Sequence, residues 1–260
     1  MKDINEKFIV FAVILAILVL PHVLTASEEN QLIDIPTAAI VRKGNYQITT
    51  RLYKDGGLLV RGNIGLMQRF NLGISYGGTR IIDQEDPELN PSPSVDIKYR
   101  LSDGGVGLPA IAVGYDQQGL GASIKDINVK DPVYKRYRNK SKGFYLVTTL
   151  EFKSLGGLEA HGGANYSFED RDDKTGSAFF GINKKIGPEI IMMADYDLAL
   201  NDDATYSYGN GKGYLNAGLR WYFAPELALE FDMLNLTENG KNQGSDKINR
   251  IIKICYTNYF

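Results

Sequence analysis

Runs of about ten residues in which apolar and polar side chains alternate fill most of this chain. In residues 226–236, for example, Leu229 and Phe231 alternate with Glu230 and Asp232. Twelve such runs occupy residues 46–53, 57–67, 70–77, 94–102, 108–116, 143–153, 157–168, 177–184, 189–200, 214–223, 226–236 and 251–260. Because successive side chains of a strand point to opposite faces, each run predicts a β-strand with one apolar face. The other face carries polar, charged or glycine residues.

The connections between these runs distinguish two kinds of β-fold. A secreted β-sandwich shows the same alternation, but runs of about ten residues match the tilted strands of a membrane barrel. Tight turns also alternate with longer polar connections, as in outer-membrane barrels. The longer connections are residues 78–93, 117–142, 169–176, 201–213 and 237–247. We therefore predict an all-β fold, a single closed antiparallel transmembrane β-barrel of about 12 strands, with the sandwich as the alternative.

The first residues have the pattern of a targeting segment. Lys2 and Lys7 precede an apolar stretch, and small residues follow it near Ala26, as in a secretory signal peptide. The uninterrupted apolar run, residues 8–20, is shorter than the roughly 20 residues that a membrane-spanning helix needs. Residues 1–26 are therefore predicted to be a signal peptide.

The rest of the chain is predicted to reach the bacterial outer membrane. Residues 27–45 are expected to form a periplasmic lead-in segment, and residues 46–260 the barrel. With the N-terminus in the periplasm, parity places the five longer connections on the external side.

The last run, Ile251–Phe260, ends on an aromatic residue. An apolar edge strand invites aggregation unless it is paired, so we expect it to pair with the strand that begins at Tyr46. This ending resembles the final strand of outer-membrane β-barrels, which finishes on Phe and is read by the barrel assembly machinery. Asn258 departs from that pattern, which prefers an apolar residue there. The resemblance implies that Phe260 contacts the assembly machinery.

The composition argues against several functions. The net charge of −2 provides no electrostatic basis for binding nucleic acid. Cys255 is the only cysteine, so an internal disulfide is excluded. His22 leaves with the signal peptide, and His161 is then the only histidine. No phosphate-binding loop is recognisable, and the acidic stretch 169–176 lacks the calcium-loop spacing of an EF-hand. We predict no metal and no cofactor.

His161 is the one candidate general base of the usual kind. Parity turns it toward the lumen. Ser167 lies six residues along the same strand, roughly 20 Å away at about 3.3 Å per residue, which is too far for proton transfer. His161 is therefore predicted to be a hydrogen-bonded lumen residue, and the protein is predicted not to be an enzyme. An outer-membrane hydrolase is the third function considered.

Charged residues on the predicted lumen face form two groups along the chain. Cations come from early strands and carboxylates from late strands, so they could form opposing walls of a pore or pair across the lumen. Because barrels of eight strands are filled and those of sixteen enclose a channel, twelve strands leave both arrangements open. The predicted lumen charges are Arg51, Arg61, Lys98, Arg100, Asp195, Asp197, Arg220, Glu230 and Asp232.

The connection 117–142 is rich in basic residues, and part of it, residues 119–128, is a candidate for a further strand segment. Its external position would allow contact with outer-leaflet lipopolysaccharide phosphates or an anionic polysaccharide. A solvated loop without a partner is the alternative. The predicted external basic residues are Lys135, Arg136, Arg138, Lys140 and Lys142.

The stretch Leu32-Ile-Asp-Ile-Pro-Thr-Ala38 resembles the lead-in motif of the YjbH-like family of outer-membrane lipoproteins and barrels. The glycine-rich stretch Asn71-Leu-Gly-Ile-Ser-Tyr-Gly77 has the same style. The resemblance implies an association with exopolysaccharide and capsule export. The predicted function is a non-enzymatic barrel, either a small pore or an accessory to export of polysaccharide or another polar solute. A closed structural or adhesive barrel that acts through its external loops is the alternative.

Overall fold

The computed structural model describes residues 30–83, 86–105, 107–125, 135–169, 175–204, 207–240 and 248–260. The predicted signal peptide, residues 1–26, lies outside these ranges.

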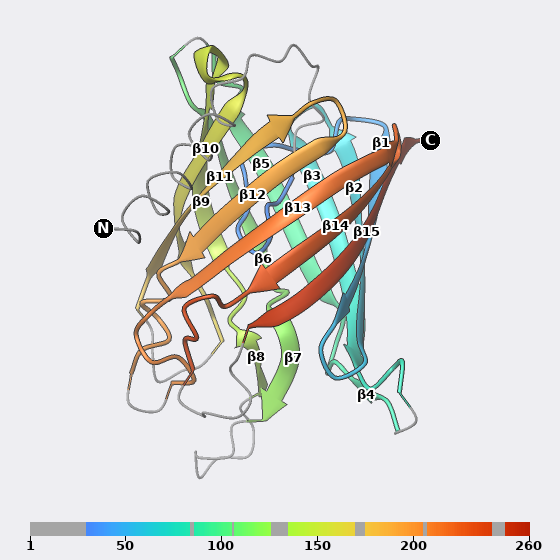
Figure 1. The fold of residues 1–260 in the computed structure, drawn as a ribbon, viewed down its shortest axis with the longest axis vertical. Coiled ribbons are helices and arrows are strands. Elements are labelled where there is room, and N and C mark those ends of the chain that lie inside the picture. Colours follow the sequence, from blue (N-terminus) through green and yellow to red (C-terminus); the bar gives the residue numbers. More distant parts are fainter. Residues whose placement is uncertain are drawn as a thin grey trace, which may run out of the picture.

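Antiparallel strands form the wall of a closed barrel (Figure 1). The sheet has 13 strands, and the two-residue β4 (Glu88–Leu89) only flanks β3, so twelve strands make the wall. These are β1 (Asn45–Tyr53), β2 (Gly57–Met67), β3 (Phe70–Thr79), β5 (Ser94–Ser102), β6 (Ala110–Asp116), β9 (Gly143–Phe152), β10 (Leu158–Tyr166), β11 (Ser177–Ile186), β12 (Ile190–Asp197), β13 (Tyr214–Ala224), β14 (Leu227–Leu234) and β15 (Asn249–Tyr259). The predicted fold class and number of strands are confirmed.

The sheet closes where β1 pairs with β15. The register sets Asn45 opposite Tyr259. The Phe260 N–H donates to the Gly44 carbonyl at 3.0 Å, and the Phe260 ring stacks on Tyr46 with centroids 6.3 Å apart. The last strand is therefore paired along its length, as expected.

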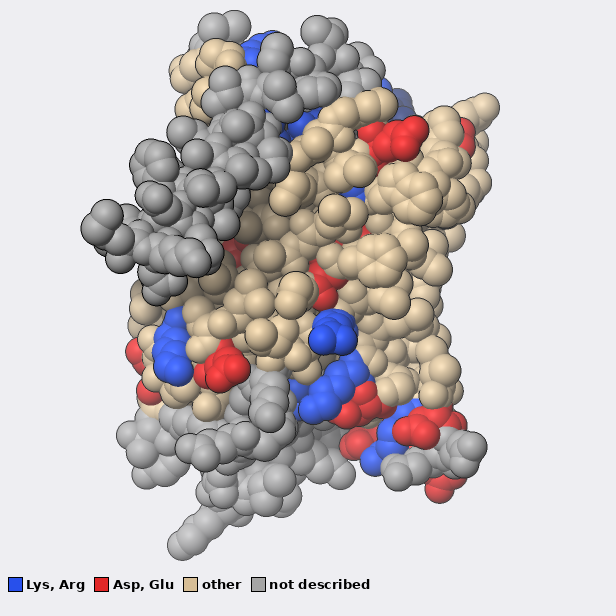
Figure 2. All heavy atoms as spheres, viewed as in Figure 1, with Lys and Arg blue, Asp and Glu red and all other residues tan. Residues whose placement is uncertain are grey.

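The outer and inner faces of the wall differ as the alternation predicts. On β14, Phe231 is 47% exposed and its neighbour Glu230 is fully buried. Large apolar side chains stay exposed on every side of the barrel, among them Ile74, Phe144, Phe180, Met192, Trp221 and Ile254. Over β13, β14 and β15 the surface is mostly uncharged, and charged side chains gather toward the ends (Figure 2). An apolar surface that encircles a barrel requires a bilayer to cover it, so this is a transmembrane β-barrel.

The two ends of the barrel are different. Tight turns lie at the end that holds the C-terminus, at the top of Figure 1, and the longer connections lie at the opposite end. One turn contains the short 3₁₀ helix η1 (Lys153–Leu155). Trp221 and Phe223 pack together near the tight turns, and Phe144 packs edge-on to Phe168 near the long connections. Aromatic girdles at both membrane interfaces are typical of such barrels.

A second, two-stranded sheet lies at the end with the long connections (Figure 1). It pairs β7 (Leu120–Lys125) with β8 (Lys135–Asn139). The additional strand segment expected near residues 119–128 is therefore present, but it lies outside the wall. Among the described residues, no helix has the length and apolarity needed to cross a membrane.

Candidate functional site in the barrel lumen

Residues 30–41 form a hairpin inside the barrel, here called the lumen hairpin. Gln31 and Pro36 form an isolated antiparallel bridge. The Leu32 N–H donates to the Ile35 carbonyl at 3.0 Å and closes the turn. The side chains of Leu32, Ile33 and Ile35 are at most 1% exposed. Residues 27–45 are predicted to form a periplasmic lead-in segment, but residues 30–41 of that segment lie inside the barrel.

Lys98 on β5 holds the two arms of the lumen hairpin together. Its ammonium donates to the Asn30 carbonyl and side-chain oxygen, both at 2.6 Å. It also contacts the carbonyls of Thr37 at 3.1 Å and Ala39 at 3.2 Å. Lys98 is 2% exposed, so four oxygens of the hairpin replace its water.

Asp195 on β12 binds the tip of the lumen hairpin. Its carboxylate accepts the N–H of Asp34 at 2.8 Å and of Ile35 at 3.3 Å. The Asp34 carboxylate in turn lies 3.1 Å from the Lys142 ammonium, which also pairs with Asp197 at 2.5 Å. Three strands further along the wall, on β15, Lys253 donates to the Ile33 carbonyl at 3.0 Å. Strands far apart in the sequence thus converge on one short segment.

Glycines in the wall make room for the apolar side chains of the hairpin. A Cβ at Gly181 would lie 2.8 Å from methyl groups of both Leu32 and Ile35. A Cβ at Gly218 would lie 2.3 Å from the Asp232 carboxylate of the wall and 3.1 Å from Ile33 of the hairpin. Real side chains avoid such distances, so the wall at these positions is shaped to the hairpin.

The predicted lumen charges do line the interior, but they do not form two opposing walls. Arg61 pairs with Asp96 at 3.1 Å and Asp116 at 2.9 Å. Arg220 pairs with Glu230 on the adjacent strand. Lys253 pairs with Glu230 at 2.5 Å and Asp232 at 2.9 Å. Arg100 lies near the tight turns, 3.6 Å from Asp103. Among the described residues, ion pairs of the lumen join nearby strands or reach the hairpin.

Three of the predicted external basic residues, Arg136, Lys140 and Lys142, are buried and turn inward. Arg136 pairs with Asp202 at 2.5 Å, and the Lys140 ammonium donates to the Asn201 carbonyl. Lys142 contacts the lumen hairpin. With exposures of 3–6%, these three side chains do not contribute to a charged outer surface.

The remaining predicted basic residues are Lys135 and Arg138. The Arg138 guanidinium lies 5.9 Å from the centre of the Tyr208 ring. The side chain of Lys135 lies outside the described part of the structure.

These contacts fasten the described parts of the connection 117–142 at the end of the barrel that carries the long connections. The Tyr137 hydroxyl on β8 lies 3.3 Å from the Ser94 hydroxyl at the start of β5. Glu169 accepts the backbone N–H groups of Tyr137 at 2.8 Å and Ser141 at 3.0 Å. Burial raises the pKa of the Glu169 carboxyl. The prediction of an outward-facing basic loop is wrong for Arg136 and Lys142, because both form ion pairs with buried carboxylates.

A recess of about 640 Å³ opens at the opposite end, where the tight turns lie. Thr37 and Ala39 of the lumen hairpin line it, together with Arg100, Glu159 and His161 of the wall. The recess therefore ends on the hairpin, which separates it from the end with the long connections.

His161 belongs to a chain of hydrogen bonds that reaches the lumen hairpin. The Ala38 N–H donates to the Thr149 hydroxyl oxygen at 2.9 Å, and this hydroxyl lies 2.9 Å from His161 Nδ1. His161 Nε2 lies 2.6 Å from Asn183 Oδ1. One neutral tautomer, protonated at Nε2, satisfies both ring nitrogens.

The hydrogen bonds that link Thr149, His161 and Asn183 resemble those of a catalytic triad, in which a base lies between a nucleophile and an orienting group. However, the Thr149 hydroxyl faces the hairpin backbone, to which it is hydrogen-bonded. The Ser167 hydroxyl contacts Ser141 at 3.4 Å and belongs to a different cluster. The geometry thus gives His161 a role in fastening the hairpin.

Sequence reasoning missed the partners of these groups. Asp96, Thr149 and Asn183 lie within the predicted strands, but the alternating pattern does not indicate which groups they contact. The small residues Gly181 and Gly218 on an otherwise polar face were an available hint that something packs against them.

No protein-family model and no curated protein matches this chain. Solved structures with a similar fold include the KdgM porin, at 10% identity and a TM-score of 0.48, covering 82% of this chain and 98% of that one. The outer membrane protein Omp33 of Acinetobacter baumannii has 11% identity and a TM-score of 0.45, covering 85% and 99%. The outer membrane phospholipase A of Escherichia coli has 12% identity and a TM-score of 0.42, covering 85% and 93%. Porins and an enzyme both occur among them, so they do not distinguish the two functions.

Proposed function

We propose that this protein is a non-enzymatic β-barrel of the bacterial outer membrane whose lumen hairpin closes the pathway at rest. A polar solute passes only when the hairpin leaves the lumen. The observation that carries the proposal is the position of residues 30–41, which fill the interior between the recess and the external end.

The contacts of the hairpin suit reversible closure. Most are hydrogen bonds from charged wall groups such as Lys98 and Asp195 to its backbone. In an undocked state water can satisfy the same groups, so each bond contributes only modestly to docking. The wall without the hairpin would be a polar, charged surface, as in a water-filled barrel.

Conductance in planar bilayers tests the proposal. The full chain is expected to be silent or to open only briefly, and a variant lacking residues 30–41 is expected to conduct steadily. A full chain that conducts continuously would show that the hairpin does not close the pathway. Gel mobility before and after heating serves as the folding control for the deletion.

A closed barrel that acts through its external loops is the second candidate. The inward contacts of the connection 117–142, such as Arg136 with Asp202, favour it because they cover the external end independently of the hairpin. If the folded deletion variant does not conduct, this candidate replaces the first.

We also propose a class of solute and two further partners. The resemblance of residues 32–38 to the YjbH-like lead-in motif supports a polysaccharide or its fragments as the polar solute. Swelling of liposomes that contain the deletion variant, in neutral and acidic oligosaccharides, would identify the class. Lipopolysaccharide around the wall and the assembly machinery at Phe260 are the further partners we propose.

A further inference from the structure

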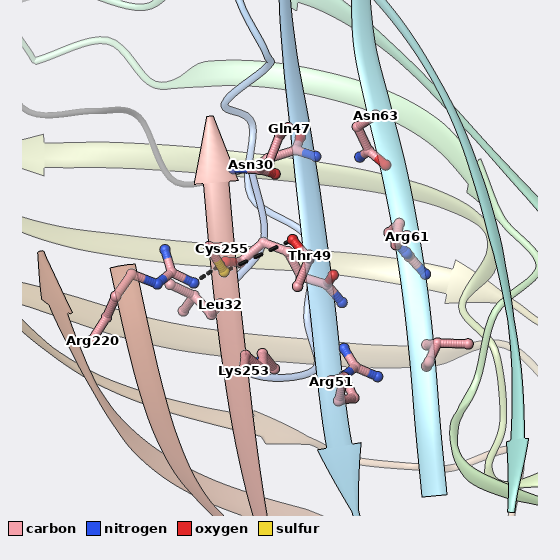
Figure 3. A pocket seen from close by; sticks show the side chains of 12 residues that line it. Asn30, Leu32, Gln47, Thr49, Arg51, Arg61, Asn63, Arg220, Lys253 and Cys255 are labelled. Atoms are coloured by element: carbon pink, nitrogen blue, oxygen red, sulfur yellow. Dashed lines mark hydrogen bonds between the residues drawn. The ribbon is translucent and has the colours of Figure 1, made fainter. Parts of the chain in front are cut away.

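A small cavity between the lumen hairpin and the wall is lined by four cations. It has a volume of about 40 Å³ and lies against β1, β2, β13 and β15 (Figure 3). The cations are Arg51, Arg61, Arg220 and Lys253. Its other described lining residues are uncharged, so no carboxylate faces this space. Among them are Gln31 of the hairpin and Gln47 and Thr49 of β1.

Three of the four cations are neutralised by carboxylates behind the cavity. Arg61 has Asp96 and Asp116 within 3.1 Å. Arg220 and Lys253 share Glu230, and Lys253 also pairs with Asp232.

Arg51 is the exception. It is 6% exposed, and its Nε atom has no hydrogen-bond partner. No described residue forms an ion pair with it. The register sets Arg51 directly opposite Lys253, and Thr49, two residues away, opposite Arg61. Like charges in facing positions repel. The carboxylates that attract Arg51 from further away, Asp34, Glu230 and Asp232, already form ion pairs with Lys142 or Lys253, and a buried cation without an ion pair of its own is costly.

We propose that this cavity binds one small oxyanion, such as phosphate, sulfate or a carboxylate, on the guanidinium of Arg51. The planar guanidinium fork matches two oxygens of such an ion. A cavity needs about 10–15 Å³ to hold a water molecule, so this one has room for a group of a few atoms. Gln47 and Thr49 offer further donors from β1. Because Asn30, Gln31 and Leu32 close the other side, the ion binds the state in which the hairpin is docked.

Anion titrations of the purified full chain in detergent test this site. Phosphate, sulfate and acetate are compared with chloride at matched ionic strength, and unfolding is followed by heat-dependent gel mobility. At least one oxyanion is expected to raise the unfolding temperature of the wild-type protein more than chloride does, and this rise should saturate with concentration. Titration calorimetry should give a stoichiometry of one binding site per chain. The arm that responds identifies the oxyanion.

Two variants make the test specific to Arg51. Arg51→Gln should lose the response, and Arg51→Lys, which keeps the charge but not the fork, should bind at least tenfold more weakly. The matched control is Arg80→Gln, since Arg80 is exposed and pairs with Glu88 at 3.2 Å. It should respond like the wild type.

Labelling of the Cys255 thiol tests the site in the wild-type protein, because Cys255 lines the same cavity. A saturating oxyanion should slow labelling of its thiol several-fold relative to chloride. The proposal is overturned if the oxyanions act only as chloride does, or if Arg51→Gln keeps a saturable response.

Discussion

Replacement of Lys98 by methionine should release the lumen hairpin from the wall. The substitution keeps the length of the side chain but removes the ammonium that four hairpin oxygens contact within 3.2 Å. A hydrogen bond to a charged group contributes about 1.5–3 kcal/mol net. The cost of burying an ammonium that pairs with no described carboxylate offsets part of that sum. We expect hairpin docking to weaken by about 3 kcal/mol, a rise of about a hundredfold in the undocked fraction.

A thiol placed in the hairpin reports this fraction. Ala38 is fully buried, so Ala38→Cys in a Cys255→Ser background is labelled by a water-soluble reagent only when the hairpin undocks. When docking is fast relative to labelling, the rate follows the undocked population. Lys98→Met should therefore raise the rate by about a hundredfold. Lys54→Met, at an exposed turn position, is the control and should leave it unchanged. A rise of less than about threefold in folded Lys98→Met protein would refute the role assigned to Lys98.

Three further substitutions test the rest of the structure. Gly181→Leu should expel the hairpin and increase conductance, because even a Cβ there lies 2.8 Å from Leu32 and Ile35. Gly62→Leu, where a Cβ meets nothing within 4 Å, should not. Phe231→Arg on the outer face should destabilise the barrel in vesicles by about 2–4 kcal/mol in urea titrations, if it lies near the bilayer midplane. A change below about 0.5 kcal/mol would contradict the lipid-facing assignment. His161→Ala should destabilise the protein by about 1–3 kcal/mol because the Thr149 and Asn183 side chains lose their partner. Loss of a detectable lipase activity without loss of stability would instead support the hydrolase.

The wall could be predicted from the sequence because its rule is local. Alternation with a period of two assigns Phe231 to the lipid and Glu230 to the lumen whatever the neighbouring strands are. The turns then fix the order of the strands, and the pairing of β1 with β15 follows from closing the sheet. None of these inferences requires knowledge of contacts across the lumen.

The contents of the lumen depend on contacts that no local pattern encodes. Asp34 and Asp195 are 161 residues apart in the chain, and nothing near either residue specifies the other. The run from Leu32 to Ile35 is apolar but too short to alternate, so it indicated only a connecting segment. For the same reason, the pattern predicts Arg136 and Lys142 to be surface cations, although their carboxylate partners, Asp202 after β12 and Asp34 in the lumen hairpin, are far away in the chain.

The position of the lumen hairpin imposes an order on assembly. The hairpin precedes every wall strand in the chain, yet it binds Lys98 on β5, Asp195 on β12 and Lys253 on β15. Its contact with Lys253 spans 220 residues, so the complete site exists only after the final strand has joined β1. The lumen hairpin is synthesised before all wall strands, but we expect it to dock last, because contacts so distant in sequence form slowly. Under the proposed closing role of the hairpin, we expect its docking, and with it the closure of the pathway, to be the final step of folding.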